Sequence, residues 1–105
     1  MHSFSQVTLF LSLNMSMCTE QELITLLQAK EKRGFDLLYD QYGPCLYLFI
    51  LRRVGDGQLA EELLEESVSH IWRQVSGYDS SKGTLVSWLL TITRNTTHDR
   101  LRASV

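Results

Sequence analysis

The sequence predicts a single all-α domain, and three features indicate it. The chain has 105 residues, a length that suits one domain with one modest hydrophobic core. Its leucines recur at intervals of three and four, and no long run alternates apolar with polar residues. Six glycines and one proline are too few for a low-complexity or disordered chain. We therefore expect a compact bundle of about four antiparallel helices with short connections.

The first helix is expected over residues 19–30. Thr19 precedes Glu22 by three residues, which is the spacing of a capping box. Residues 1–18 contain the apolar stretch VTLFLSL, but no basic leader precedes it and no small-x-small cleavage site follows. We interpret them as an N-terminal extension, disordered or translated from an upstream start codon. A short helix or strand packed on the body is the alternative, and the domain itself is placed at residues 19–105.

A second helical segment covers residues 31–54, where apolar and aromatic side chains fall at helical spacing. Gly43 and Pro44 interrupt this pattern. Because proline lacks a backbone donor and clashes with the preceding turn, we expect a kink or a break there. Gly-Asp-Gly at residues 55–57 then predicts a turn.

The third helix is expected from Gln58 to Ser76, and it is strongly acidic. Four glutamates fall within residues 61–66. Such a cluster is mildly unfavourable on a merely solvated face, because like charges at i and i+4 repel each other. Two interpretations of this acidic face remain open: it is simply solvated, or it binds a basic protein partner. For the neighbouring Trp72, core packing and the edge of a partner surface are the two alternatives.

The fourth helix is expected from Thr84 to Ala103, after a loop at residues 77–83, and it has two contrasting faces. One face is apolar and includes Trp88, which we expect to be buried against the other helices. The opposite face carries hydroxyl, amide and basic groups and no acidic residue: Ser87, Thr91, Arg94, Asn95, His98 and Arg102. These groups suit phosphate oxygens and base edges, so the face is either a nucleic-acid contact or simply solvated.

Signals of catalysis or metal binding are weak. The chain has no Gly-rich phosphate loop, and His70 beside Glu66 reads as a surface pair rather than a metal site. We predict no catalytic residue, no metal and no cofactor. Cys18 and Cys45 form no CxxC motif and are read as free thiols of a cytoplasmic protein. No apolar run reaches the length of about 18 residues that would span a bilayer.

Four stretches match one family in order and spacing: FDLLYDQYGPCLY, LAEELLEESVSHIW, YDSSKGTLVSWLLTITRN and RNTTHDRLR. Together they make the segment from Phe35 to Arg102 resemble region 2 of bacterial sigma factors of the extracytoplasmic-function (ECF) class. Several positions depart from the family pattern. Glu65 replaces a usual Gln, and Ser67-Val68-Ser69 replaces Val-Phe-Leu, so we expect the docking surface of this helix to be more polar and less bulky than the family pattern. Ser80, Lys82 and Leu85 replace Pro, Arg and an aromatic residue.

The resemblance implies a sigma region 2 fold and a non-enzymatic role in transcription initiation. The domain would bind the clamp helices of RNA polymerase core, and an anti-sigma factor is a further expected partner. The implied polymerase-binding residues are Glu61, Glu62, Glu65 and Trp72. A complete family member also carries a region 4 domain, which we expect to be absent from this chain. An excised domain, a truncated gene product and a single-domain relative are the alternatives that remain open.

The resemblance also implies that the domain recognises and melts the minus-ten promoter element. A base of the non-template single strand would be flipped out of the stack into a pocket of the protein. The implied DNA-binding residues are Tyr78, Asp79, Ser80, Lys82, Arg94, Asn95, His98 and Arg102. The alternative is a degenerate helical module that pairs with polymerase or an anti-sigma factor without binding DNA.

Overall fold

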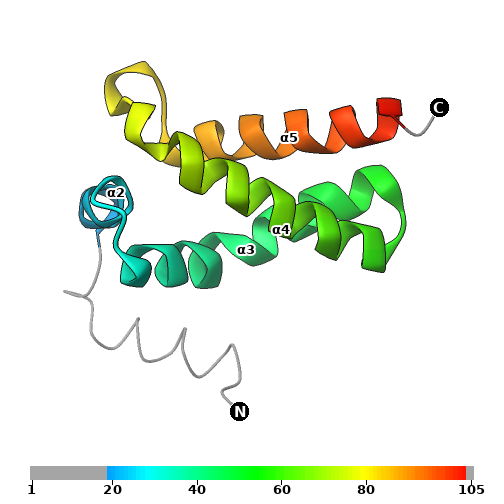
Figure 1. The fold of residues 1–105 in the computed structure, drawn as a ribbon, viewed down its shortest axis with the longest axis horizontal. Coiled ribbons are helices and arrows are strands. Elements are labelled where there is room, and N and C mark those ends of the chain that lie inside the picture. The colour runs from blue at the N-terminus through cyan, green and yellow to red at the C-terminus, as the bar shows by residue number, and fades with distance from the viewer. Residues whose placement is uncertain (1–18, 104–105) are drawn as a thin grey trace, which may run out of the picture.

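The computed structural model describes residues 19–103, and these residues form the all-α bundle that the sequence predicts. The predicted extension at residues 1–18, including Cys18, lies outside the described residues. The elements are α2 (Glu20–Gln28), α3 (Lys32–Val54), α4 (Gly57–Gln74), η1 (Val75–Gly77), η2 (Ser80–Lys82) and α5 (Leu85–Ala103), where η marks a 3-10 helix. Figure 1 shows α3, α4 and α5 along the length of the molecule, with α2 across one end.

The capping box at the start of α2 is confirmed. The Thr19 hydroxyl accepts a hydrogen bond from the Glu22 amide at 3.1 Å, and the Glu22 carboxylate accepts one from the Thr19 amide at 2.8 Å. These two bonds satisfy amides that a helix start leaves unpaired. The apolar side of α2 buries Leu23, Ile24 and Leu27.

Of the kink or break predicted at Pro44, a break is wrong, because α3 continues through this residue as one helix. Pro44 is exposed, so its ring lies on the solvent side of the helix and does not disturb the core. Buried leucines on both sides, Leu38 and Leu46, pack the two halves of α3 on the same core. Tertiary packing therefore outweighs the local penalty of proline.

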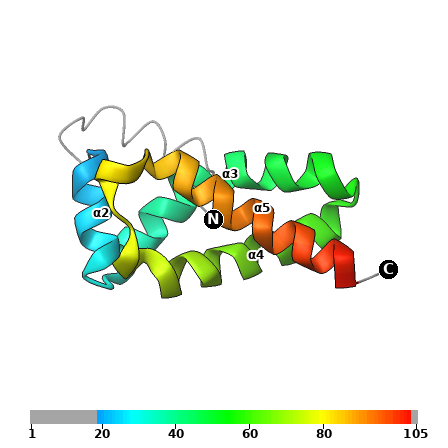
Figure 2. The ribbon, with the colours of Figure 1, turned by 90° about the horizontal axis from the view of Figure 1, so that it is seen from above.

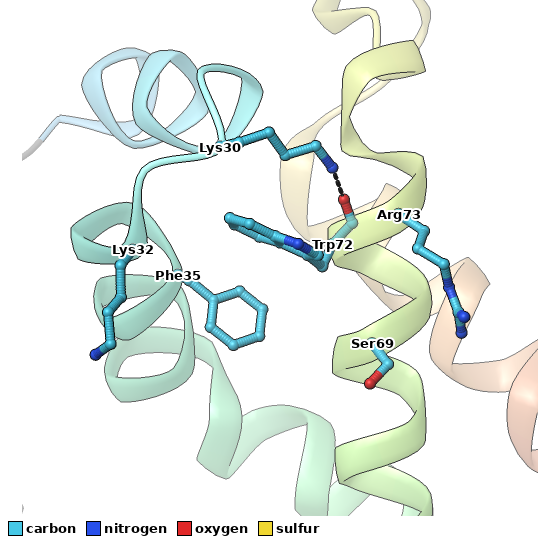
Figure 3. Close-up of a pocket in the computed structure, with 6 residues that line it drawn as sticks. All are labelled: Lys30, Lys32, Phe35, Ser69, Trp72 and Arg73. Atoms are coloured by element: carbon cyan, nitrogen blue, oxygen red, sulfur yellow. Dashed lines mark hydrogen bonds between the residues drawn. The ribbon is translucent and has the colours of Figure 1, made fainter.

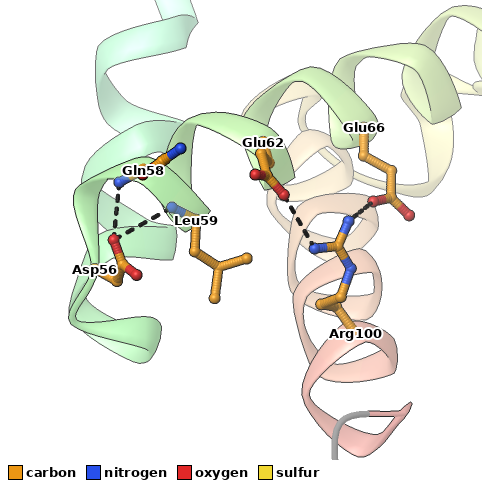
Figure 4. A network of polar contacts seen from close by, with 6 residues as sticks. All are labelled: Asp56, Gln58, Leu59, Glu62, Glu66 and Arg100. Atoms are coloured by element: carbon orange, nitrogen blue, oxygen red, sulfur yellow. Dashed lines mark hydrogen bonds and ion pairs between the residues drawn. The ribbon is translucent and has the colours of Figure 1, made fainter.

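A short link turns the chain from α3 into α4. Gly55 adopts a left-handed backbone conformation with φ of 70°, and its amide donates to the Leu51 carbonyl at 2.8 Å. The Asp56 carboxylate then accepts from the Gln58 amide at 3.0 Å and the Leu59 amide at 3.4 Å (Figure 4). This N-cap fixes the start of α4 at the predicted turn.

The core lies between α3, α4 and α5 and extends to α2. It contains the apolar faces of α4 and α5, with Leu63, Ile71, Leu85 and Leu89 fully buried. Trp88 packs against the core as expected but is only half-buried, because it lies at the edge of the core. Its indole packs beside the ring of a buried tyrosine, Tyr78, with centroids 5.1 Å apart.

The loop after α4 is tied to α2. The Gln28 side-chain amide donates to the carbonyls of Val75 at 3.1 Å and Tyr78 at 2.9 Å. The Tyr78 hydroxyl donates to the Gly83 carbonyl at 2.8 Å, which closes the loop on itself. Figure 2 shows this segment beside α2, at the end of the bundle opposite the C-terminus. Across residues 19–103, no helix combines the length and apolar character needed to traverse a bilayer.

Candidate functional site

The four glutamates of α4 form two pairs that face different neighbours. Glu61 and Glu65 are exposed and line a cavity of about 500 Å³ together with Tyr39, Tyr47 and Leu64. Partial burial raises the pKa of the Tyr39 phenol above 10.0, and the negative charges of Glu65 and Glu61 raise it further. The cavity therefore combines carboxylates with aromatic rings.

Glu62 and Glu66 instead face α5, where Arg100 binds both of them (Figure 4). The guanidinium nitrogens lie 3.4 Å from Glu62 Oε1 and 2.8 Å from Glu66 Oε1. All three side chains keep at least 35% of their surface exposed, so each ion pair contributes at most about 1 kcal/mol. Although we grouped Glu62 with Glu61 and Glu65, the structure places it outside their cavity.

Trp72 lies on the same side of α4 as Glu61 and Glu65, two to three turns further along. Its indole meets the Phe35 ring edge-on, with centroids 5.0 Å apart at 75°. The Lys30 ammonium lies 4.7 Å from the indole centroid and donates to the Trp72 carbonyl. Trp72 therefore packs against α3 and also borders a surface cavity.

This second cavity has a volume of about 360 Å³ and is basic and aromatic (Figure 3). It is lined by Lys30, Lys32, Phe35, Ser69, Trp72 and Arg73. Lys32 is paired with Asp36 at 3.0 Å. The exposed side of α4 therefore changes along its length, from carboxylates beside Tyr39 to cations beside Trp72.

The expectation that Ser67-Val68-Ser69 makes the docking surface more polar is wrong for two of the three residues. Ser67 and Val68 are buried, and only Ser69 is exposed. The Ser67 hydroxyl has no hydrogen-bond partner within the described part of the chain. The replacement at Ser67 therefore changes the core and leaves the surface of α4 unaffected.

The polar face of α5 is exposed as predicted: Ser87, Thr91, Arg94, Asn95, His98 and Arg102 all reach solvent. Within residues 19–103, the Arg94 side chain makes no hydrogen bond or ion pair with another residue. Arg102, in contrast, is paired with Asp99. The charge at Arg94 is therefore available to a ligand, whereas part of the charge at Arg102 is already neutralised.

The loop residues divide into a buried anchor and an exposed turn. Tyr78 is buried, so its expected role as a DNA contact is corrected to that of an internal support. Asp79, Ser80 and Lys82 are exposed. The Asp79 carboxylate accepts from the Ser81 hydroxyl at 2.8 Å and the Ser81 amide at 2.9 Å, which lowers the pKa of Asp79 below 3.8. The turn is thus held by its own polar contacts.

A third cavity, of about 200 Å³, lies between α4 and α5 and was not anticipated from the sequence. It is lined by His70, Gln74, Ile92, Asn95, Thr96 and Asp99. His70, which we read as a surface partner of Glu66, instead places Nδ1 2.8 Å from the Thr96 hydroxyl. Among residues 19–103, no cluster of three or more His, Cys, Asp or Glu side chains could hold a metal ion.

This helical domain, with an acidic face on α4 beside a polar and basic face on α5, matches one known family. The chain belongs to the Sigma-70 region 2 family, whose pattern matches residues 38–104. The predicted resemblance is therefore confirmed. Because this is a family of sigma factors, the prediction that the chain is not an enzyme is confirmed as well.

Two relatives are themselves ECF RNA polymerase sigma factors. The chain is 34% identical over 73 residues to SigK of Mycobacterium ulcerans (strain Agy99), an alignment covering 70% of this chain and 39% of that protein. It is 35% identical over 83 residues to BldN of Streptomyces coelicolor (strain ATCC BAA-471 / A3(2) / M145), covering 79% of this chain and 31% of that protein. The chain thus spans less than half the length of these relatives. No solved structure matches it significantly.

Proposed function

We propose that this domain acts in transcription initiation by binding RNA polymerase core through α4 and promoter DNA through α5. The observation that carries the proposal is the presence of two exposed faces of different chemistry on adjacent helices. Glu61 and Glu65 line an acidic cavity on α4, and Arg94 and Asn95 lie on the polar face of α5. The shared core fixes α4 and α5 relative to each other, and Arg100 adds a surface bridge between them.

The polymerase side of the proposal rests on the first cavity. Carboxylates beside aromatic rings suit a basic side chain of a partner, because a guanidinium can pair with the acids and stack on a ring. Trp72 further along α4 adds an aromatic surface of the kind that often dominates protein interfaces. Glu62 is assigned a lesser role here, since Arg100 already binds it.

The DNA side of the proposal rests on Arg94, Asn95 and the exposed turn at Asp79, Ser80 and Lys82. Within residues 19–103, neither the Arg94 nor the Lys82 side chain is engaged by another residue, so both can meet phosphates. Flipping a base out of the minus-ten element costs a few kcal/mol, which contacts from this face would offset. His98 and Arg102 extend the same face toward the C-terminus.

A charge-reversal experiment tests the polymerase side. The double variant Glu61→Lys/Glu65→Lys should bind core polymerase at least about tenfold more weakly, equivalent to about 1.4 kcal/mol. The matched control, Glu20→Lys/Glu31→Lys, changes net charge by the same amount at exposed positions in and beside α2. If both double variants lose affinity equally, the effect is one of overall charge and the assignment to α4 fails.

The distribution of charge favours the alternative, an interaction module that binds no DNA. Of the arginines on α5, Arg102 is paired with Asp99 and Arg100 with α4, and the whole chain carries a net charge of -2. Both facts weaken the attraction for a polyanion. The alternative predicts polymerase binding without any preference among DNA sequences.

Fluorescence anisotropy with a labelled single-stranded oligonucleotide separates the two functions. Contacts from Arg94, Arg102 and Lys82 predict a log–log salt slope of about -2, from about -0.7 for each phosphate. Arg94→Ala should reduce the slope by less than one unit and weaken all sequences alike. No sequence preference with core polymerase present, together with unchanged binding in Arg94→Ala, would support the module instead.

A further inference from the structure

We propose that two copies of this chain pair through α4, with the acidic part of one helix against the basic part of the other. The acidic part is the cavity at Glu61 and Glu65, and the basic part is the cavity at Trp72 and Arg73. The polymerase contact proposed above uses the carboxylates and Trp72, but it gives the cations no role. A second copy would provide partners for both kinds of charge.

The two cavities follow one another along the same pair of helices. On α3, Phe35 lines the basic cavity, and Tyr39, one turn later, lines the acidic cavity. On α4, Ser69 lines the basic cavity, and Glu65, one turn earlier, lines the acidic cavity. Both cavities therefore open on the same side of the molecule, where a single partner can reach them together.

Exposed residues spaced four apart form a ridge on this side of α4: Glu61, Glu65, Ser69 and Arg73. The ridge thus begins with two carboxylates and ends with a guanidinium. When two such ridges run antiparallel about a two-fold axis, Glu61 of each copy meets Arg73 of the other. Glu65 then lies opposite the small side chain of Ser69, which leaves room for the helices to approach. The order of charges is therefore complementary to its own reverse, as a symmetric interface requires.

The charges on this ridge are not neutralised within residues 19–103. Glu61, Glu65 and Arg73 form no ion pair with another residue of this range. The two carboxylates repel each other at i and i+4, so an incoming cation would relieve this repulsion. Tyr39 keeps 42% of its surface exposed beside them, and a guanidinium that pairs with Glu61 can stack on its ring.

Aromatic surface adds to the pairing at the basic part. Trp72 is half-buried and packs edge-on with Phe35, and both rings border the open cavity (Figure 3). Lys30 lies beside the indole and contributes a second cation. The net charge of -2 on each copy opposes association, so we expect a weak dimer that salt weakens further.

The pairing would hide the surface proposed to bind polymerase. Glu61 and Glu65 cannot contact a second copy and core polymerase at the same time, so the dimer would hold the domain in an inactive form. Core polymerase would draw monomers from it by mass action. This consequence rests on the proposed function, whereas the pairing itself does not.

Sedimentation equilibrium of the whole chain, over a series of micromolar concentrations at low salt, tests the pairing. Glu61→Lys and Arg73→Glu should each weaken self-association at least about tenfold, because each places like charges opposite one another. The double variant Glu61→Lys/Arg73→Glu should restore it, because the two charges are exchanged. One substitution adds two units of charge and the other removes two, so the double variant keeps the net charge of -2.

Glu20→Lys is the matched control for Glu61→Lys. It changes the net charge equally at an exposed position of α2, outside both cavities, and should leave self-association unchanged. A wild-type chain that stays monomeric throughout the series would overturn the pairing. A dimer that neither single substitution weakens, or that the double variant does not restore, would overturn it as well.

Binding of core polymerase to the same variants separates the pairing from the proposed function. The double variant Glu61→Lys/Arg73→Glu should dimerise like the wild type but bind polymerase more weakly, because it lacks the Glu61 carboxylate. Undiminished polymerase binding in that variant would contradict the proposed function and leave the pairing in place. A monomeric wild type whose polymerase affinity falls in Arg73→Glu would instead assign the basic part to polymerase and overturn the pairing.

Discussion

Replacing Gly34 by alanine should destabilise the domain, because α2 and α3 approach too closely there for a side chain. A Cβ atom at Gly34 would lie 2.6 Å from Leu26 Cβ, 3.0 Å from the Leu26 carbonyl carbon and 3.1 Å from the Leu27 nitrogen. Two of these neighbours are backbone atoms, and a Cβ cannot rotate away from them. The two helices must therefore separate at this corner.

Overpacking of this kind costs about 1–3 kcal/mol. In a domain of this size each kcal/mol lowers the melting temperature by about 4–8 °C, so Gly34→Ala should melt clearly below the wild type. Thermal unfolding followed by far-UV circular dichroism measures the change.

Gly77→Ala is the matched control for Gly34→Ala. No atom lies within 4 Å of a Cβ at Gly77, and its backbone φ is not in the left-handed region. Alanine there should leave the melting temperature unchanged, or raise stability by about 0.4–1 kcal/mol by restricting the unfolded chain. Equal melting temperatures for the two alanine variants would refute the argument that the corner between α2 and α3 needs glycine.

Two further predictions concern a buried hydroxyl and an exposed carboxylate. Ser67→Ala should leave the free energy of unfolding unchanged or raise it by about 1 kcal/mol, because the hydroxyl it removes is buried without a partner; a loss above 1 kcal/mol in urea denaturation would contradict this. The Asp79 carboxyl should titrate by NMR below 3.8 in the wild type and closer to that value in Ser81→Ala, which lacks the side-chain hydrogen bond. Because folding lowers this pKa, the turn's contribution to stability is present at neutral pH and is lost as the pH falls through the lowered pKa.

The helices themselves were predictable because their signals are local. The capping box at Thr19 and the glycines and Asp56 between α3 and α4 act over three or four residues, so the sequence alone locates them. Pro44 misled the prediction for the same reason. Its penalty is local, whereas the packing of α3 on residues distant in the chain outweighs it.

The composition of the surfaces was less predictable, because it depends on how α4 and α5 are aligned. Helical periodicity places all four glutamates on exposed arcs. It does not show that Glu62 pairs with Arg100, whereas Glu61 and Glu65 line a cavity. The same alignment creates the cavity at His70. The burial of Tyr78 was also not predictable from the sequence. This residue belongs to a polar loop motif, but its ring packs beside Trp88 inside the domain.

The bond from Gln28 to the loop determines how far the protein can be shortened. The family match begins at residue 38, ten residues beyond Gln28, so a truncation to the matched segment would remove α2. The carbonyls of Val75 and Tyr78 would lose their donor, and the partners of Leu23 and Leu27 would be uncovered. A shortened protein beginning at residue 38 should therefore lose the proposed DNA binding even with every residue of the polar face intact. A fragment for functional assays should therefore retain α2 together with its N-cap at Thr19.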